Sequence, residues 1–281
     1  MVHSINSTPA IEVADLRFAY PSGVEALRGV TVTIRSGEFV GVVGQNGSGK
    51  TTLVKHFNGL LKPTSGVVRL LGVDTRTKGV AELARSAGYV FQNPDHQIFC
   101  NTVREEITFG PRNLGMTAAE IEASCRYVVE LLDLQGLEDR HPFRLSRGER
   151  QRLAIASLLA MRPRILILDE PTGGQDRQQI SRLLGTLRQL NAAGHTLILV
   201  THDMELLAEC ASRTLVMFRG ALLLDGTPRE VFQEVEALQR TALTPPMITR
   251  WSLGAGLPVP ALTVAEAVQA FDRHPSPLAQ E

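Results

Sequence analysis

The stretch at residues 44–51, which reads GQNGSGKT, limits the possible folds of this chain more than any other feature. It matches the pattern G-x-x-x-x-G-K-[ST], and it lies between the aliphatic run FVGVV and a segment with helical periodicity that ends near residue 60. Glycines in such a loop let successive backbone N–H groups point at phosphate oxygens, and the start of the following helix adds its positive end. The stretch therefore predicts a strand, a phosphate-binding loop (P-loop) and a helix, in that order.

The polar residues of this loop have distinct predicted roles. Lys50 would reach the β- and γ-phosphates of a nucleotide, and the Thr51 hydroxyl would hold Mg²⁺. An ordinary glycine turn before a helix is the competing interpretation, and the strand–loop–helix context argues against it. The predicted nucleotide-binding residues of this stretch, together with the residue that follows it, are Gly44, Gln45, Asn46, Gly47, Ser48, Gly49, Lys50, Thr51 and Thr52.

Two further aliphatic runs predict buried strands beside the first. RILILDEP at 164–171 and TLILVTHD at 196–203 are short and continuous, which is typical of strands covered on both faces. Residues 177–193 between them have a helical pattern, and Gly194 suits the end of a helix. Buried strands that alternate with helices predict an α/β fold with a parallel sheet between two layers of helices.

Two carboxylates end the first of these runs. Asp169 is predicted to bind Mg²⁺, directly or through water, and Glu170 to orient a water molecule and accept its proton. Two solvated acids at a strand end would be the simpler interpretation of these residues alone. The P-loop makes the catalytic interpretation the favoured one.

The composition argues against several classes of protein. Among 281 residues, 29 Lys and Arg balance 29 Asp and Glu, so the chain lacks the excess of positive charge that nucleic-acid binding favours. Its three cysteines are too few and too widely spaced for a disulfide framework, so reduced thiols are expected. The first residues have no signal-peptide pattern, and no apolar run approaches ~18 residues, so the chain is not expected to cross a membrane itself.

The stretch at residues 144–152, which reads RLSRGERQR, permits three interpretations: a basic patch, a helix start, or part of a nucleotide site. Ser146 and Glu149 have the spacing of a capping box, which predicts a helix N-terminus with free N–H groups. The neutral net charge and the lack of interleaved aromatic residues argue against nucleic acid. Arg150 and Arg152 are expected on the surface of this helix.

In their order along the chain, these motifs resemble those of the ATP-binding subunits of ABC transporters, over about residues 10–226. The resemblance implies that Tyr20 packs against adenine. It implies that Gln92, in GYVFQNPD, is the Q-loop glutamine that contacts Mg²⁺ and water. It also implies that His202, in VTHD, is the switch histidine that contacts the γ-phosphate and that Glu170 supports hydrolysis. The implied cofactors are ATP and Mg²⁺.

The same resemblance implies a more detailed architecture. We expect a RecA-like P-loop NTPase core with an N-terminal antiparallel β subdomain, together forming the ATP-binding domain of residues 10–226. A helical subdomain is expected as an insertion at about 96–150, and a helical extension at 227–273 is expected to help pair two ATPases. Residues 1–9 are expected to be flexible and the tail 274–281 to be disordered.

The family resemblance also gives residues 144–152 a role in pairing. LSRGE falls at the signature motif, usually LSGGQ, and GGQD at 173–176 falls at the D-loop. In the family, two subunits pair head to tail, so that each ATP lies between the P-loop of one chain and the signature of the other. The residues implied in this interface are Leu145, Ser146, Arg147, Gly148, Glu149 and Asp176.

The signature departs from the usual pattern at two positions. Arg147 replaces a glycine, and its side chain either adds positive charge near phosphate or points to solvent, which is favoured. Glu149 replaces a glutamine and adds negative charge beside an anion site, which predicts a weakened composite site. The second ATPase is either another copy of this chain or a related chain, and an altered signature is compatible with the latter.

Residues 92–99, which read QNPDHQIF, resemble the ATPases of energy-coupling-factor importers, which take up vitamins or transition-metal ions such as cobalt. That resemblance implies a transmembrane coupling protein and an integral membrane solute-binding protein as partners, at the cytoplasmic face of the membrane. Asp95, Gln97 and Phe99 are the residues expected to contact the coupling protein, although NPD alone also fits a simple turn. Two alternatives remain: a conventional ABC importer or exporter, and a non-transport ABC protein that acts on ribosomes or nucleic acid.

Overall fold

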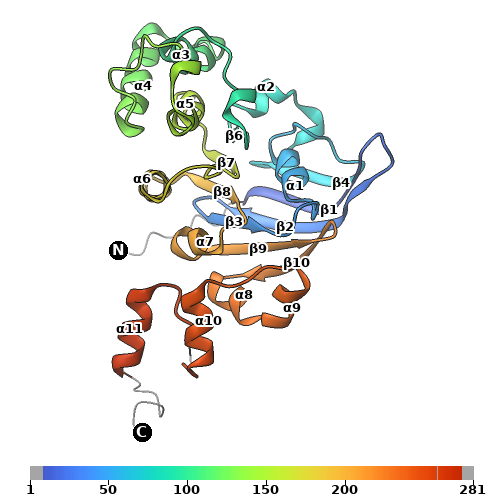
Figure 1. Cartoon of the computed structure of the whole chain (residues 1–281). Helices are drawn as coiled ribbons and strands as arrows, with labels where there is room; N and C mark the ends of the chain where they lie inside the picture. The colour runs from blue at the N-terminus through green and yellow to red at the C-terminus, as the bar shows by residue number, and fades with distance from the viewer. Residues whose placement is uncertain (1–8, 258, 274–281) are drawn as a thin grey trace.

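The computed structural model describes residues 9–257 and 259–273, so the expectations for residues 1–8 and for the tail 274–281 lie outside the described residues. Two β-sheets lie in the middle of the molecule, with one group of helices at the top of Figure 1 and the C-terminal helices at the bottom. Among the described residues, none of the helices combines the length and the apolarity that a membrane span requires.

The central sheet has six strands. They are β3 (Phe39–Val43), β6 (Ala87–Val90), β7 (Ile165–Asp169), β8 (Thr196–Val200), β9 (Arg213–Phe218) and β10 (Ala221–Gly226). Their order is β10-β9-β3-β8-β7-β6, and all pairs are parallel except β9 with β10. Every residue of β3, β7 and β8 is buried, as their aliphatic sequences predict.

The smaller sheet is antiparallel and lies on one side of the central sheet (Figure 1). It contains β1 (Pro9–Ala19), β2 (Glu25–Arg35), β4 (Ser65–Leu70) and β5 (Val73–Asp74), in the order β2-β1-β4-β5. The helix α1 (Lys50–Phe57) packs between the two sheets, because its buried residues Leu53, Val54 and Phe57 share one apolar core with both of them.

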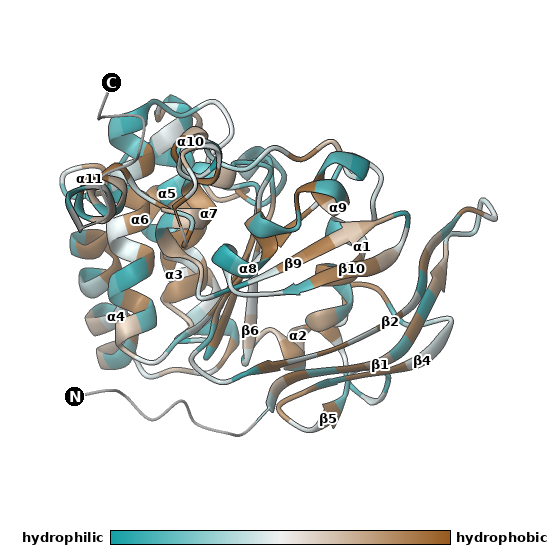
Figure 2. Cartoon of the chain, turned by 90° about the horizontal axis from the view of Figure 1, so that it is seen from below, coloured by the Kyte–Doolittle hydropathy of each residue, from teal (hydrophilic) through white to brown (hydrophobic). Residues whose placement is uncertain are grey.

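The inserted segment forms a helical group at one end of the central sheet. It contains α3 (Val103–Asn113), α4 (Ala118–Leu131) and α5 (Arg147–Leu159). Each of these helices begins at a capping box, in which the first Ser or Thr and a Glu three residues later bond each other's backbone N–H. Together with α6 (Arg177–Ala192), the group lies on one side of the central sheet (Figure 2), and the buried apolar residues of these helices share a core with β3, β7 and β8.

The remaining helices complete the fold. The short α2 (Val80–Leu83) precedes β6, and α7 (Met204–Cys210) joins β8 to β9. The C-terminal part contains α8 (Pro228–Gln233), α9 (Val235–Arg240), α10 (Met247–Gly254) and α11 (Val264–Arg273). Val231, Phe232 and Leu238 of α8 and α9 share a third apolar core with α7 and β9, which fixes this part to the central sheet.

Candidate nucleotide-binding site

The polar residues singled out from the sequence gather where the parallel strands of the central sheet end. The P-loop follows β3, Gln92 follows β6, Glu170 follows β7 and His202 follows β8. Because the carboxyl ends of parallel strands meet at one edge, ligands of open α/β sheets bind there. The strand order places β8 between β3 and β7, and β6 beside β7, so these four loops are neighbours.

The backbone of the P-loop leaves no room for side chains at two of its glycines. A Cβ atom on Gly44 would lie 2.3 Å from the Met217 carbonyl oxygen, and one on Gly49 would lie 2.8 Å from the Ala26 carbonyl oxygen. Gly49 is the N-cap of α1 with a φ of 102°, and no side chain of the described residues caps this helix. The first N–H groups of α1 therefore face the loop without a side-chain partner, as an anion site requires.

Two buried polar side chains of the loop fit a phosphate ligand. The Ser48 hydroxyl is buried and has no hydrogen-bond partner within the described part of the chain. The Lys50 ammonium is also buried, and it donates to the carbonyl oxygens of Gly44 at 2.8 Å and Gln45 at 3.0 Å. Burial lowers the pKa of Lys50, while Glu170 and Asp169 act in the opposite direction. A phosphate anion would satisfy both groups.

Asp169 is a buried carboxylate whose two oxygens have different partners. Its Oδ1 accepts a hydrogen bond from the Thr51 hydroxyl at 3.2 Å, and its Oδ2 accepts one from the Tyr89 phenol at 2.7 Å. Carboxylate and hydroxyl oxygens are the ligands that Mg²⁺ prefers, so this pair fits the predicted metal. The pKa of Tyr89 is raised, first by burial and then by the charge of Asp169 and their hydrogen bond.

Sequence reasoning did not single out Tyr89. In the structure, β6 and β7 pair in parallel with Tyr89 opposite Ile167, and Asp169 lies two residues further along the same face of β7. That register is a property of the sheet order, which the sequence alone does not specify.

Glu170 lies at the centre of a second polar group. Its Oε2 accepts a hydrogen bond from the Gln92 amide at 2.7 Å, and its Oε1 lies 3.5 Å from Nδ1 of His202. The backbone of Glu170 is in the left-handed region, with a φ of 47°, which turns the chain sharply after β7. The structure therefore brings together the three residues predicted to support hydrolysis. They line an open cavity of about 770 Å³ that also includes Asn46 of the P-loop.

Tyr20 lies beside the start of the P-loop helix α1. Its ring is partly exposed and packs edge-to-face on Phe18, with 4.9 Å between ring centroids. Its phenol bonds the Thr52 hydroxyl at 3.0 Å, which connects it to the start of α1. The position leaves an aromatic surface available beside the phosphate site, as stacking of a base requires.

The signature residues lie at the start of α5, apart from α1 (Figure 1). The predicted capping box is present, with the Ser146 N–H donating to Glu149 at 2.7 Å and the Glu149 N–H donating to the Ser146 hydroxyl at 3.3 Å. These hydrogen bonds lower the pKa of Glu149. Asp176 begins α6 in a similar way, by accepting from the N–H of Gln179 at 2.8 Å.

Arg147 is exposed, and its guanidinium also covers the loop before α6. A Cβ atom on Gly174 would lie 2.8 Å from a guanidinium nitrogen of Arg147, and one on Gly173 would lie 3.6 Å from another. The signature and the GGQD loop of the same chain are therefore in contact. Two features of this position favour glycine. The φ of Gly174 is 72°, and Arg147 occupies the space that a side chain would need.

The arginines after the signature differ from the expectation of simple surface residues. Arg150 is half-buried and donates to the Asp95 carboxylate at 2.7 Å and to the Leu145 carbonyl at 2.5 Å. Arg152 donates to the carbonyl oxygen of Leu132 at 2.8 Å. Both side chains lie where α5 meets other segments, and unpaired backbone carbonyls there attract guanidinium groups.

The residues predicted to contact a membrane protein occupy different environments. Asp95, in the one-turn helix Pro94–His96, pairs with Arg150. The Gln97 amide is directed inward, where it donates to the Ala154 carbonyl at 3.0 Å and accepts from the Phe91 N–H at 3.4 Å. Phe99 is 61% exposed and packs edge-to-face on the exposed ring of Phe109.

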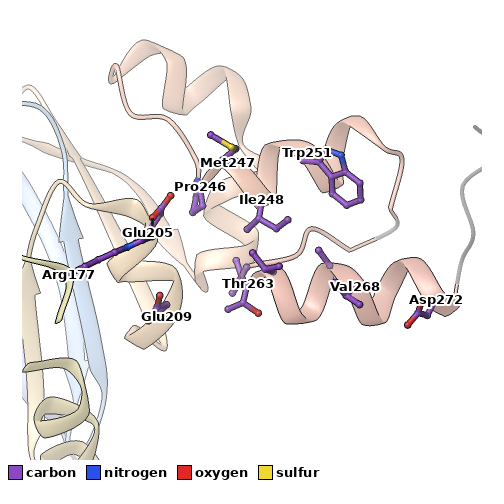
Figure 3. A pocket seen from close by; sticks show the side chains of 13 residues that line it. Arg177, Glu205, Glu209, Pro246, Met247, Ile248, Trp251, Thr263, Val268 and Asp272 are labelled. Atoms are coloured by element: carbon purple, nitrogen blue, oxygen red, sulfur yellow. Dashed lines mark ion pairs between the residues drawn. The ribbon is translucent and has the colours of Figure 1, made fainter. Parts of the chain in front are cut away.

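A groove of about 710 Å³ lies between the C-terminal helices and the start of α6. Figure 3 shows Met247, Ile248 and Trp251 on one side and Val268 on the other, with an ion pair between Arg177 and Glu205 at one end. Met247 is 72% exposed, and Trp251 and Val268 are about half exposed. The lining is therefore mainly apolar with charged residues at its edge.

Comparison with known proteins agrees with this geometry. The family model described as ABC transporter matches residues 27–173. The energy-coupling factor transporter ATP-binding protein EcfA of Methanocaldococcus jannaschii is 41% identical over 85% of this chain and 86% of its own length. A protein of the same name from Methanothermobacter thermautotrophicus is 42% identical over 84% of this chain and 76% of its own length.

Some relatives are much longer than this chain. A protein of Caldanaerobacter subterraneus with the provisional name ABC transporter ATP-binding protein is 46% identical over 94% of this chain but only 46% of its own length. The chain likewise spans 44% and 45% of relatives from Methanosarcina acetivorans and Methanosarcina mazei. It thus spans about half the length of these curated relatives.

Solved structures have the same fold. CbiO1 from Clostridium perfringens, described as part of the ABC transporter complex CbiONQ, superposes with a TM-score of 0.75 and is 35% identical over 84% of this chain and 96% of its own. A dimeric ATP-binding cassette bound to ADP and Pi superposes with a TM-score of 0.71 at 28% identity, over 78% of this chain and 99% of its own. These neighbours confirm the predicted fold class. The chain belongs to the ABC transporter family of ATP-binding proteins.

Proposed function

We propose that this chain binds and hydrolyses ATP as a subunit of an ABC importer of the energy-coupling-factor type. The observation that carries the ATPase part is the meeting of Lys50, Asp169, Gln92, Glu170 and His202 at one edge of the central sheet. The likeness to two EcfA proteins and to CbiO1 supports the import part.

Binding begins with the phosphates of ATP in the P-loop. The Lys50 ammonium exchanges its bonds to the carbonyl oxygens of the loop for bonds to the β- and γ-phosphates, and the Ser48 hydroxyl gains a partner. Tyr20, beside the start of α1, offers its partly exposed ring to adenine. Thr51 and Asp169 would hold Mg²⁺, with Gln92 as a further contact, and the metal would neutralise negative charge on the phosphates.

Hydrolysis depends on the carboxylate of Glu170. Glu170 accepts a proton from a water molecule, whose oxygen bonds the γ-phosphorus as the bond between this phosphorus and the bridging oxygen breaks, leaving ADP and phosphate. The Gln92 amide, 2.7 Å from Glu170, orients the carboxylate. His202, on its other side, contacts the γ-phosphate and so registers whether ATP or ADP is bound.

Pairing with a second ATP-binding cassette completes the site. The helix start at Ser146 and Gly148 contacts the γ-phosphate of ATP held by the opposite P-loop, because its free N–H groups and positive end attract an anion. The second cassette, either another copy of this chain or a related one, also covers the apolar groove between α10 and α11. That groove begins beside Arg177, directly after Asp176 of the D-loop.

The membrane partner contacts the surface after Gln92. Phe99 and Phe109 provide an exposed aromatic pair, and Asp95 provides a carboxylate that is partly accessible. A cationic side chain of the coupling protein would compete with Arg150 for Asp95. The chain would then lie at the cytoplasmic face of the membrane, and the solute would be a vitamin or a transition-metal ion carried by a separate integral membrane protein.

A hydrolysis assay tests the ATPase part. The purified chain should release phosphate from ATP in the presence of Mg²⁺, and removal of Mg²⁺ by EDTA should stop the release. Tyr127→Phe, on the exposed surface of α4, serves as a control that should retain this rate. A chain that binds ATP but releases no phosphate, alone or with its co-purifying subunits, would refute the ATPase part.

Recovery of the complex from native membranes tests the import part. A tagged chain should retain, in mild detergent, a multi-span coupling protein and a small integral membrane solute-binding protein. Recovery of a periplasmic binding protein and its permease would favour a conventional importer. Recovery of ribosomes or nucleic acid, with no membrane protein, would contradict the import part of the proposal and leave the ATPase part unaffected.

A further inference from the structure

We infer that Tyr89 is a positioning residue for the Mg²⁺ site, and this inference rests on the proposed function. The phenol O–H donates to Oδ2 of Asp169 over 2.7 Å, while Oδ1 of the same carboxylate accepts from the Thr51 hydroxyl. One oxygen is therefore held by the core of the protein, and the other faces the side where the P-loop would present a metal and its phosphates. By bonding Oδ2, Tyr89 leaves Oδ1 as the oxygen that faces the metal.

The position of the phenol is itself firmly set. Tyr89 lies on β6, next to β7, and its side chain is only 5% exposed. Its ring packs edge-to-face on Phe91, with 5.0 Å between the ring centroids. Such packing restricts the ring to one orientation, so the O–H is held in a fixed position toward Asp169.

The chemistry of a phenol suits this task better than that of a charged donor. Asp169 is 4% exposed, so an oxygen without a hydrogen bond would carry the full cost of a buried unpaired acceptor. A lysine or arginine at position 89 would satisfy that oxygen but would also cancel the negative charge that attracts a cation. A neutral O–H satisfies the oxygen and leaves the charge. This is the outer-shell arrangement that orients carboxylate ligands in metal sites.

Tyr89→Phe removes only the hydroxyl and tests the inference directly. We expect the dissociation constant for Mn²⁺, measured by electron paramagnetic resonance with a non-hydrolysable ATP analogue, to rise about tenfold or more, as for other outer-shell changes. Affinity for the nucleotide in EDTA should be unchanged, which also shows that the variant is folded. The maximal hydrolysis rate should recover when Mg²⁺ is raised to saturation.

The chain supplies two matched controls, because it has only three tyrosines. Tyr127→Phe loses an exposed phenol and should leave the Mn²⁺ affinity unchanged. Tyr20→Phe breaks a hydrogen bond to Thr52 beside the P-loop, and it should alter nucleotide affinity equally with and without metal.

The outcomes separate this inference from the function on which it rests. If the unmodified chain hydrolyses Mg·ATP and Tyr89→Phe has unchanged Mn²⁺ affinity, the positioning role is wrong and the proposed function stands. If Tyr89→Phe lowers the maximal rate at saturating metal without changing metal affinity, the positioning role is also wrong. A chain that binds no nucleotide at all overturns both.

Discussion

The P-loop precedes the N-terminus of α1, and the signature lies at the N-terminus of α5, but the two helix starts are built differently. Around the P-loop, Lys50 and Asp169 are buried and already hydrogen-bonded within the chain. At the start of α5, Ser146 and Arg147 are exposed. This difference supports our proposal that the first helix start binds ATP in its own chain, whereas the second contacts ATP bound to another cassette.

The largest expected effect lies on the P-loop side. Glu170→Gln keeps the hydrogen-bonding shape of the side chain but removes the proton acceptor, so the hydrolysis rate should fall by about 10²–10⁴-fold. Affinity for ATP should be retained, because the phosphates are held by the P-loop. Phosphate release and equilibrium nucleotide binding measure the two quantities separately. An unchanged rate would remove Glu170 from the mechanism.

Gly44→Ala should disrupt the backbone of the P-loop. The new Cβ would lie 2.3 Å from a backbone oxygen and 2.5 Å from the Ser48 hydroxyl, and the backbone cannot move away easily. We expect a loss of about 2–5 kcal/mol in the free energy of unfolding, from overpacking and backbone strain together, and a loss of nucleotide binding. Urea unfolding measures the former.

Gly47→Ala is the matched comparison for that change. Gly47 also has a positive φ, of 77°, but a Cβ there would meet nothing within 4 Å. It should therefore cost only the backbone strain, about 1 kcal/mol or slightly more. Equal losses from the two substitutions would contradict the close approach at Gly44.

A smaller effect is expected where the signature meets the D-loop. Gly174→Ala should destabilise the chain by about 1–2 kcal/mol, because its φ is unfavourable for alanine and its Cβ would meet the Arg147 guanidinium. In an Arg147→Ala background the second part of this cost should disappear. A double-mutant cycle should therefore give a coupling energy of about 0.5–1 kcal/mol. Strict additivity would mean that Arg147 does not occupy that space in solution.

The smallest expected effect concerns the capping box of α5. Ser146→Ala should lower the free energy of unfolding by about 1 kcal/mol, because the N–H of Glu149 loses its acceptor. The pKa of Glu149 is lowered in the folded chain, so the stability that its carboxylate contributes is present near neutral pH. It is lost as the pH falls below the usual pKa of a glutamate toward this lowered value. Urea unfolding at pH 7 and at acid pH should show a smaller decrease for the variant than for the unmodified chain.

The sequence predicted local features well and distant contacts poorly. The P-loop, the buried strand before Asp169 and the cap at Ser146 depend on residues close in sequence, and the structure has all three. The contact between Tyr89 and Asp169 joins residues 80 apart, and that between Asp95 and Arg150 joins residues 55 apart.

Those distant contacts depend on which strands and helices become neighbours. Tyr89 reaches Asp169 because β6 pairs with β7 in one register, and Arg150 reaches Asp95 because α5 packs beside the turn after β6. Arg147 is exposed, as expected, but its guanidinium also covers Gly174, because α5 and the loop before α6 lie together. No periodicity of side chains specifies these arrangements, since each is decided by packing across the core.

The central claim is that the P-loop binds ATP within this chain, whereas the start of α5 acts on ATP bound to another cassette. The most direct test is the ATP dissociation constant of Glu170→Gln chains, measured at a dilution where cassettes do not associate. Adding Lys50→Ala should abolish ATP binding. Adding Ser146→Arg, at an exposed position, should leave the ATP dissociation constant unchanged. The same substitution should prevent the ATP-dependent association of two cassettes at high protein concentration. If Ser146→Arg weakens binding to the dilute single chain as much as Lys50→Ala does, the two helix starts form one site and the account is wrong.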